Sequence, residues 1–244
     1  LLSQLMYFSS SNIRNLLKTL YRDLYRYPVI ERIRKGNSDT LDEGFIESEF
    51  NKELLQTRFL GVGNPSESGV HLLYYFRQEN KIPKSLFVNT DDVIERQNDG
   101  SVSLRSDFQN ATRFVFIDDI CGSGQQATND TNVKRCVADL RRIKPDAQIS
   151  YLMLFGLSAG IKKVKECGLY DYAAAVIELD DSYRCFSDNS RYFCDGQHNK
   201  AVAQGIAYKY GYKIIQEYMR VLGKNLYEQD FIAKKHALGF GNCQ

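Results

Sequence analysis

The sequence predicts an α/β fold, built on a parallel, doubly wound sheet with a helical segment ahead of it. Short runs of apolar, β-prone residues alternate with stretches whose apolar residues recur at helical spacing, over roughly a hundred residues. The runs at 114–117, 148–155 and 172–179 are nearly continuous in apolar residues. Such runs are typical of parallel strands that are buried on both faces of a sheet.

Composition is that of an ordinary globular protein, with 43% hydrophobic and 25% charged residues in a chain of 244. The net charge of +2 gives no chain-wide attraction to nucleic acid or to a membrane surface. No apolar stretch approaches the roughly eighteen residues that a membrane span needs. The six cysteines form no C-x-x-C pair and there are only three histidines, so no zinc cluster is expected. A reducing cytoplasm is the simplest setting.

Two parts of the chain are expected: a helical segment over residues 1–58 and an α/β domain over residues 59–244. Chemistry is hard to place in the first part, so packing or a partner surface is its expected role. The chain begins without an initiator Met and ends in G-F-G-N-C-Q. These ends are consistent with a fragment whose last strand is missing.

Within the helical segment the spacing predicts two helices. Ser11 or Asn12 is expected to cap the first helix, which is interrupted at Pro28 because proline lacks a backbone N–H. The second helix is expected to begin near 39–42, and the K-G-N-S-D stretch at 35–39 is the expected linker.

The chain is organised around Arg113–Thr128, R-F-V-F-I-D-D-I-C-G-S-G-Q-Q-A-T. The apolar run Phe114–Ile117 predicts a buried strand, and Asp118 and Asp119 follow at its end. A Gly-Ser-Gly turn then precedes a stretch with helical spacing at about 126–142. Outward backbone N–H groups and a helix N-terminus suit a phosphate, whereas carboxylates accept hydrogen bonds from sugar hydroxyls or hold a hydrated Mg²⁺. The stretch therefore predicts a site for a polyol phosphate.

A second strand–loop–helix unit lies upstream, with a short strand at 58–63, the loop N-P-S-E-S-G at 64–69 and a helix at 70–78. It can be a second anion site or an ordinary strand-to-helix turn. A strand is expected at 85–89. The polar stretch 90–109 is expected to contain a hairpin around its Asp-Gly pair, either as a lid over the site or as an exposed edge hairpin.

Downstream of the central motif, the strand at 148–155 leads into a helix at 160–167 and a further strand at 172–179. The loop 180–195 is rich in aromatic residues, which either stack on a flat base or pack within an Ω-type loop. Two helices, broken at Gly211, are expected to follow.

The segment F-V-F-I-D-D-I-C-G-S-G-Q-Q resembles the PRPP-binding motif of type I phosphoribosyltransferases: four apolar residues, two acids, two apolar residues and a Thr/Ser- and Gly-rich loop. It departs from that motif at Gly122 and Gln126, where the family has small hydroxylated residues. The segment D-D-I-C-G-S-G-Q-Q-A, with S-G-V-H-L-L-Y-Y-F-R upstream, more closely resembles the phosphoribosyltransferase-like effector domains of bacterial conflict and anti-phage systems. The resemblance implies a Rossmann-like sheet.

The resemblance also implies roles for particular residues. Asp118 and Asp119 would bind the ribose hydroxyls and be the catalytic pair. The 5′-phosphate would be wrapped by Gly122, Ser123, Gly124, Gln125 and Gln126, and pyrophosphate would be bound by Ser66, Ser68 and Gly69. Mg²⁺ would be held mainly through the substrate pyrophosphate, without dedicated protein ligands. The expected partners are PRPP and a base or nucleotide-like acceptor.

Three readings of function stay open on the sequence. The chain can transfer phosphoribosyl to a nitrogenous acceptor, or it can be a non-catalytic sensor of PRPP or a nucleotide. It can also be a defence effector that a partner triggers through residues 1–58. No general base can be named, and an apolar run followed by two acids also ends many other doubly wound strands.

Overall fold

The structure is a computed structural model that describes residues 6–62, 68–97, 101–193, 199–221 and 223. The chain divides into two compact units, residues 7–178 and residues 1–6 with 179–244. The helical segment and the sheet thus share one unit, which contains the central motif.

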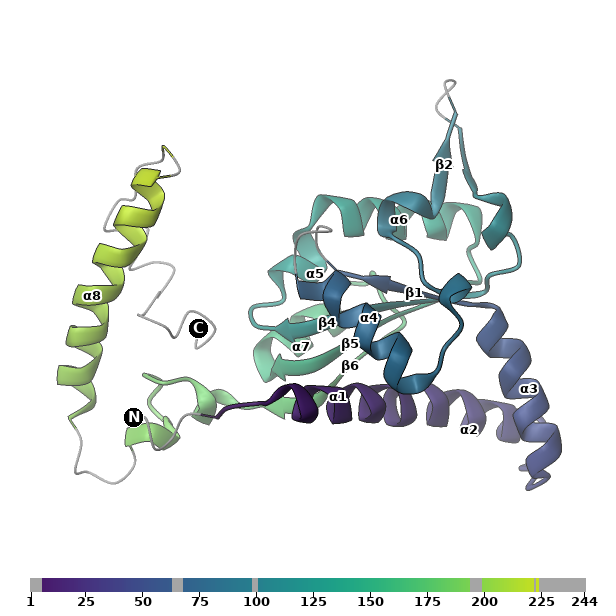
Figure 1. Ribbon diagram of the computed structural model, residues 1–244, viewed down its shortest axis with the longest axis horizontal. Coiled ribbons are helices and arrows are strands. Elements are labelled where there is room, and N and C mark those ends of the chain that lie inside the picture. Colours follow the sequence, from purple (N-terminus) through teal and green to yellow (C-terminus); the bar gives the residue numbers. More distant parts are fainter. Residues whose placement is uncertain (1–5, 63–67, 98–100, 194–198, 222, 224–244) are drawn as a thin grey trace. The chain divides into compact units, whose positions relative to one another are not determined.

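The first unit is built on a four-stranded sheet with the order β1-β4-β5-β6 (Figure 1). The strands are β1 (Thr57–Gly61), β4 (Arg113–Cys121), β5 (Gln148–Leu157) and β6 (Tyr172–Leu179). The sheet is parallel: β4 pairs with β1 on one side and with β5 on the other. The predicted parallel α/β fold is confirmed.

The sheet continues beyond β1 through a single bridge between Phe59 and Phe87. The backbone N–H of Val88 also donates to the Phe59 carbonyl at 3.1 Å. The strand expected at 85–89 is reduced to this bridge, because Lys84–Leu86 forms a 3₁₀ turn instead.

The bridge at Phe87 defines where the strand order reverses. From β1 the chain runs through α4 (Ser68–Asn80) to this outer edge, and then returns to β4 on the opposite side of β1. In open α/β sheets, ligands bind outside the carboxyl ends of the strands at such a switch point. The carboxyl ends of β1 and β4 form such a switch point.

Helices cover both faces of the sheet, as a doubly wound fold requires. One face is covered by α5 (Gln125–Asn129), α6 (Thr131–Ile143) and α7 (Ser158–Glu166). Figure 1 shows α6 on this side and the long N-terminal helix on the opposite side. Alternate β4 side chains enter the two cores, Phe116 on the α6 side and Ile117 on the other.

The N-terminal helix is continuous, and the interruption expected at Pro28 is wrong. It runs through α1 (Ser10–Thr19), a π-helical stretch (Leu20–Arg26) and α2 (Tyr27–Gly36). Pro28 falls in the first turn of α2, directly after the π-helical stretch, where a missing N–H is tolerated. The cap is Ser9 rather than the residues expected, since its hydroxyl accepts the Asn12 N–H at 3.2 Å.

Residues 7–58 supply part of the sheet's own core. Leu17 and Leu20 are fully buried, and Tyr25 and Val29 nearly so, in the cluster that packs beneath β4 and β5. A linker follows as expected, but it begins at Asn37 rather than at residue 35, because α2 runs to Gly36; it turns through left-handed Ser38 and Asp39. Beyond it, α3 (Glu43–Leu55) begins at the cap Asp42.

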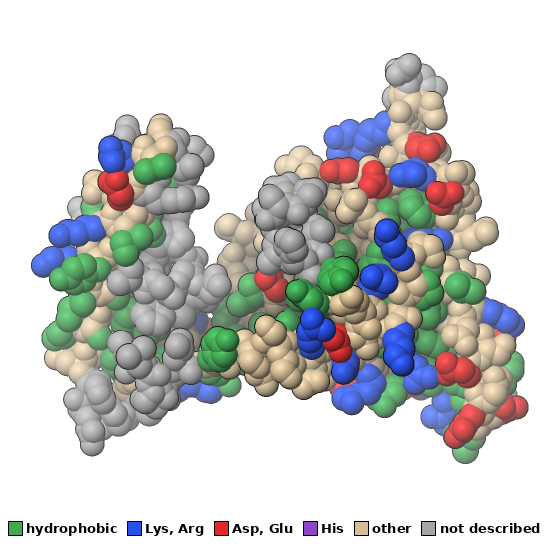
Figure 2. All heavy atoms as spheres, viewed as in Figure 1, with side chains coloured by type: hydrophobic (Ala, Val, Ile, Leu, Met, Phe, Trp, Pro, Cys, Tyr) green, Lys and Arg blue, Asp and Glu red, His purple; other side chains and the backbone are tan. Residues whose placement is uncertain are grey.

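The expected hairpin is present as β2 (Ile94–Arg96) and β3 (Val102–Leu104), although its Asp-Gly turn lies outside the described residues. The hairpin contacts α6 near its turn, where Arg96 pairs with Asp139 at 2.5 Å. Lys, Arg, Asp and Glu side chains are interspersed around the hairpin and α3 in Figure 2, in keeping with the small net charge.

In the second unit, α8 (Lys200–Val221) is one helix, so the break expected at Gly211 is wrong. A glycine costs a helix only about 1 kcal/mol, which is too little to end one of this length. Within the described ranges, no helix is long and apolar enough to cross a membrane.

Candidate functional site

The site begins where β4 leaves the sheet. Asp118 and Asp119 are residues six and seven of this strand, at the carboxyl edge that the switch point defines. Successive strand side chains point to opposite faces, so the two carboxylates differ in environment. The two acids are adjacent in the chain, but their side chains lie on opposite faces of the sheet.

Asp118 faces the α6 side of the sheet and is only 3% exposed. One carboxylate oxygen accepts a short hydrogen bond from the Tyr151 hydroxyl of β5, and the other accepts the Asp119 N–H at 2.9 Å. Burial raises the pKa of Asp118 to about 7, although the hydrogen bond from Tyr151 opposes this shift. Asp118 is thus a buried carboxyl group that hydrogen bonds hold in place.

The Tyr151 ring continues the network toward the phosphate loop. It lies 5.1 Å from the Tyr170 ring, centroid to centroid, and the Tyr170 hydroxyl donates to the Ala127 carbonyl of α5 at 2.7 Å. A tyrosine inside the apolar run 148–155 was the sequence signal for this contact. The sequence reasoning did not use it.

Asp119 is half-buried and lies at the start of the loop. One of its carboxylate oxygens accepts the Ile120 N–H at 2.8 Å. Since a carboxylate offers about four acceptor positions, most of its capacity stays available for a ligand hydroxyl. Asp119 is therefore the better placed of the two acids to contact a sugar.

The predicted phosphate loop is a tight turn with exposed side chains. Ser123, Gln125 and Gln126 are exposed, and the Gln125 N–H donates to the Ser123 hydroxyl at 3.4 Å. Gly124 has a φ of 73°, a left-handed conformation that favours glycine. Gly122 is partly buried beside it.

The helix after the loop is shorter than expected. The stretch predicted as one helix divides into α5 and α6, because Asp130 takes an extended conformation and caps α6 by accepting the N–H groups of Asn132 and Val133 at 2.9 Å. A five-residue α5 carries a smaller dipole than a long helix. Loop amides must therefore supply most of any attraction for a phosphate.

A close backbone contact fixes the loop from the other side. A Cβ added to Gly160, in the first turn of α7, would lie 2.1 Å from the Gly122 carbonyl oxygen. One added to Gly124 would lie 2.9 Å from the Gly160 carbonyl oxygen. Only glycine permits this approach, and the sequence reasoning missed it, since G-L-S-A-G carries no marker of a distant contact.

Cys121 ends β4 beside this loop. Burial raises the pKa of its thiol to about 11, which favours the protonated thiol at neutral pH.

The second predicted anion loop can be placed only in part. Ser66 lies outside the described residues, while Ser68 and Gly69 form the start of α4. Because β1 and β4 are adjacent and parallel, the segments that follow them leave the sheet at the same edge. The pyrophosphate role of these residues stays a prediction.

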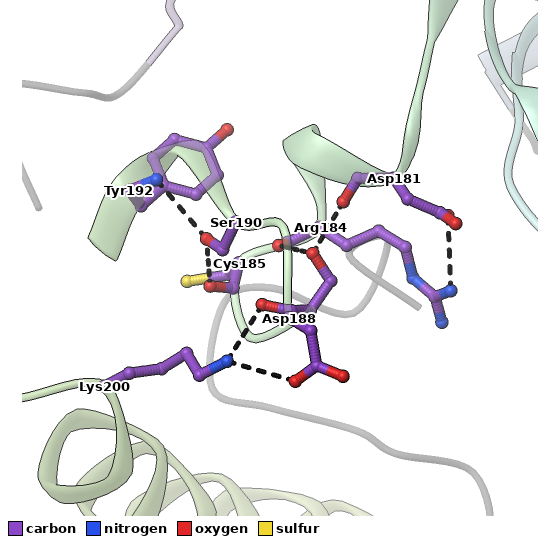
Figure 3. Close-up of polar contacts among 8 residues, drawn as sticks. Asp181, Arg184, Cys185, Asp188, Ser190, Tyr192 and Lys200 are labelled. Carbon is purple, nitrogen blue, oxygen red and sulfur yellow. Dashed lines mark hydrogen bonds and ion pairs between the residues drawn. The ribbon is translucent and has the colours of Figure 1, made fainter. Parts of the chain in front are cut away.

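The aromatic loop belongs to the second unit and is held by its own contacts (Figure 3). The Ser190 hydroxyl donates to the Cys185 carbonyl at 2.5 Å, and Lys200 reaches the Ser187 carbonyl at 3.1 Å. The Arg191 guanidinium lies 3.4 Å from the Tyr183 ring centroid.

The other predicted stacking residues also have partners within this loop. The rings of Phe186 and Phe193 stack on each other at 5.8 Å. Stacking of these aromatic rings on a base stays a prediction.

The parallel sheet, the acidic strand end and the glycine turn at the switch point define a phosphoribosyltransferase-like α/β protein. A sequence model of the PRTase-CE family matches residues 1–244, and the chain belongs to this family. Among curated proteins, no match was found.

One solved structure that the chain resembles is a mutant hypoxanthine phosphoribosyltransferase from Trypanosoma cruzi, complexed with the product IMP. The identity is 13%, with a TM-score of 0.35, over 72% of this chain and 76% of that one.

Proposed function

We propose that this protein binds Mg·PRPP at the carboxyl ends of β1 and β4 and transfers its phosphoribosyl group to a nitrogenous acceptor. The observation that carries the proposal is the position of Asp118–Gln126 at the switch point of a sheet whose chain belongs to the PRTase-CE family. Family membership and site geometry support the same ligand class.

In this proposal the two acids divide the work. Asp119 accepts hydrogen bonds from the ribose hydroxyls, because it is the accessible carboxylate. Asp118, held by Tyr151, fixes the strand end and adds a buried group beneath the sugar. The amides of Gly122–Gln126 bind the 5′-phosphate.

The reaction breaks the bond between the ribose anomeric carbon and the pyrophosphate oxygen, and forms a bond from that carbon to the acceptor nitrogen. The bonding electrons leave with pyrophosphate, so the sugar acquires oxocarbenium character. The Asp119 carboxylate stabilises this developing charge, and the loop amides hold the 5′-phosphate and so fix the ribose in position. The acceptor loses its proton to a base that we do not assign.

In this proposal Mg²⁺ arrives with the substrate, and the half-buried Asp119 carboxylate is the kind of oxygen ligand that Mg²⁺ accepts. Throughout the described residues, no group of three His, Cys, Asp or Glu side chains could hold a metal ion by itself. Mg²⁺ prefers phosphate oxygens and water, and when bound it would neutralise charge on the departing pyrophosphate. Asp119 is the nearest candidate for a contact through water.

A non-catalytic sensor is the second candidate. It is favoured by the burial of Asp118, whose carboxylate is engaged by Tyr151 and by backbone, which leaves it poorly placed to meet a substrate. The departures from the family motif at Gly122 and Gln126 point the same way.

A bacterial defence setting is also part of the proposal and rests on the sequence resemblance alone, whereas a cytoplasmic location rests on the cysteine content. A partner that docks on residues 1–58 would contact the outward side of this segment, because its inward residues are buried against the sheet.

Titration calorimetry tests the binding proposal. We expect Mg·PRPP to bind the wild-type chain, and Asp119→Asn to weaken this binding at least tenfold, since a charge-assisted hydrogen bond contributes about 1.5–3 kcal/mol. Asp92→Asn is the matched control, because Asp92 forms a second pair of adjacent acids with Asp91 in a 3₁₀ turn (Thr90–Asp92) and is exposed. Equal affinity in wild type and Asp119→Asn would remove Asp119 from the site.

Pyrophosphate release separates the enzyme from the sensor. The assay supplies Mg·PRPP with a panel of purine, pyrimidine and nicotinamide-like acceptors. Release that requires one acceptor and is lost in Asp119→Asn supports transfer. Tight binding without release for any acceptor supports the sensor.

A further inference from the structure

A polar cavity lies at the amino ends of the strands, remote from the acidic strand end. It has a volume of about 190 Å³ and lies between the N-terminal helix and the starts of β4, β5 and β6. Its apolar wall includes Leu24, Pro28 and Val29, and its polar lining includes Arg32, Arg113, Gln148 and Ser150. No role for this cavity follows from the proposed function.

Arg113 is a buried cation with incomplete hydrogen bonding. It is 8% exposed, and its Nε is buried without a hydrogen-bond partner. Its nearest carboxylate is Glu53, at 3.7 Å from Nη2, which is too long for a good hydrogen bond. A buried unsatisfied donor marks a place where a water or an ion belongs.

The local charges do not balance. Arg32 and Arg113 share the single carboxylate oxygen Glu53 Oε2, with Arg32 the closer at 2.8 Å. Burial lowers the pKa of Arg113, and the neighbouring Arg32 charge lowers it further. Two guanidinium groups and one carboxylate leave one positive charge beside the cavity.

Asp171, which also lines the cavity, does not cancel this charge. Its carboxylate is engaged by Arg141 at 2.8 Å and by the Ile149 N–H at 2.7 Å. The excess therefore stays with the pair Arg32 and Arg113.

We propose that this cavity binds a small oxyanion, a carboxylate or a phosphate, between Arg32 and Arg113. Guanidinium groups match both oxyanions with paired N–H donors. The small volume excludes a nucleotide, since pockets for larger ligands start at about 300 Å³. The Ser150 hydroxyl and the Gln148 amide on β5 supply further polar contacts.

The test uses the full-length chain with inorganic phosphate in one arm and acetate in the other, at constant ionic strength. Binding is followed by the NMR signals of arginine Nε–H groups, with the Arg113 signal assigned by its absence in Arg113→Lys. We expect this signal to shift and saturate with at least one of the two anions.

Two variants test whether the anion binds beside Arg32. Arg32→Gln should weaken binding about tenfold or more, because one charge-assisted contact is lost. Arg22→Gln is the matched control, since it removes a charge from the same long helix but pairs with Asp23 outside the cavity. Arg32 has a 45% exposed side chain, so its substitution leaves folding intact even where Arg113→Lys does not.

Gly160→Ala tests whether the anion binds in this cavity or at the phosphate loop. It disturbs Gly122 but not the amino end of the sheet, so the anion-dependent shift should persist. Three results would overturn the proposal: an unresponsive Arg113 signal with both anions, equal affinity in Arg32→Gln and wild type, or a response that disappears only in Gly160→Ala.

Discussion

At the scale of single residues, the contact between Asp118 and Tyr151 gives the site its character. An acid at the end of an apolar strand reads as a ligand-binding group, yet here one of the pair is a buried structural acid. The pattern of two acids was visible in the sequence. Their division into an inward and an outward carboxylate required the register of β4 against β5.

The raised pKa of Asp118 predicts a pH-dependent stability. The carboxyl has a pKa near 4 when unfolded and about 7 when folded, so the folded state holds the proton between these values. The free energy of unfolding contributed by this group is then fully present below pH 4 and is lost as the pH rises toward 7.

Asp118→Asn should remove this dependence. We expect the variant to gain stability relative to wild type from pH 5 to pH 8, by up to roughly 4 kcal/mol, because the amide has no charge to bury. Urea unfolding at the two pH values measures this change. Parallel pH profiles for the two proteins would contradict the buried-acid account.

Tyr151→Phe removes the hydroxyl that donates to this carboxylate. Since that hydrogen bond lowers the pKa of Asp118, its loss should move the pKa upward. We expect a loss of about 1–3 kcal/mol at pH 8 and a smaller loss at pH 5, where the carboxyl is protonated. In an Asp118→Asn background the cost should shrink, and an undiminished cost would show that the hydroxyl acts elsewhere.

At the scale of elements, the strands and the motif were predictable because buried parallel strands are apolar runs. The strands at 148–155 and 172–179 were placed to within two residues. Errors fell where a local signal was overridden: packing carried a helix through Pro28, and the Asp130 cap divided a helix whose apolar spacing continues. The contact between Gly160 and Gly122 was not predictable, because the two glycines are far apart in the sequence.

Gly160→Ala tests whether this packing holds the phosphate loop in place. The added Cβ would meet the Gly122 carbonyl, so the loop must shift. We expect a stability loss of about 1–3 kcal/mol and at least tenfold weaker binding of Mg·PRPP. Gly205→Ala in α8 is the control, because nothing lies within 4 Å of its Cβ position. Unchanged binding in Gly160→Ala would mean that the loop does not depend on this contact.

At the scale of the whole molecule, the helices between residues 10 and 55 are a layer of the sheet unit. Their apolar spacing predicted helices, but spacing alone could not tell a docking surface from a core face. Leu20→Ala should therefore cost about 2–5 kcal/mol, the range for a fully buried leucine. Leu41→Ala, at a site that is 76% exposed, should change stability by less than about 0.5 kcal/mol. Similar values for the two variants in chemical denaturation would contradict this layer.

We expect the carboxyl edge of the sheet, between the ends of β1 and β4, to bind a ribose 5-phosphate. A crystal structure of the chain with Mg·PRPP would show this binding. We expect the 5′-phosphate on the amides of Gly122–Gln126 and a ribose hydroxyl within hydrogen-bond distance of Asp119. Ligand density at any other edge of the sheet, with Asp119 free of contact, would contradict it.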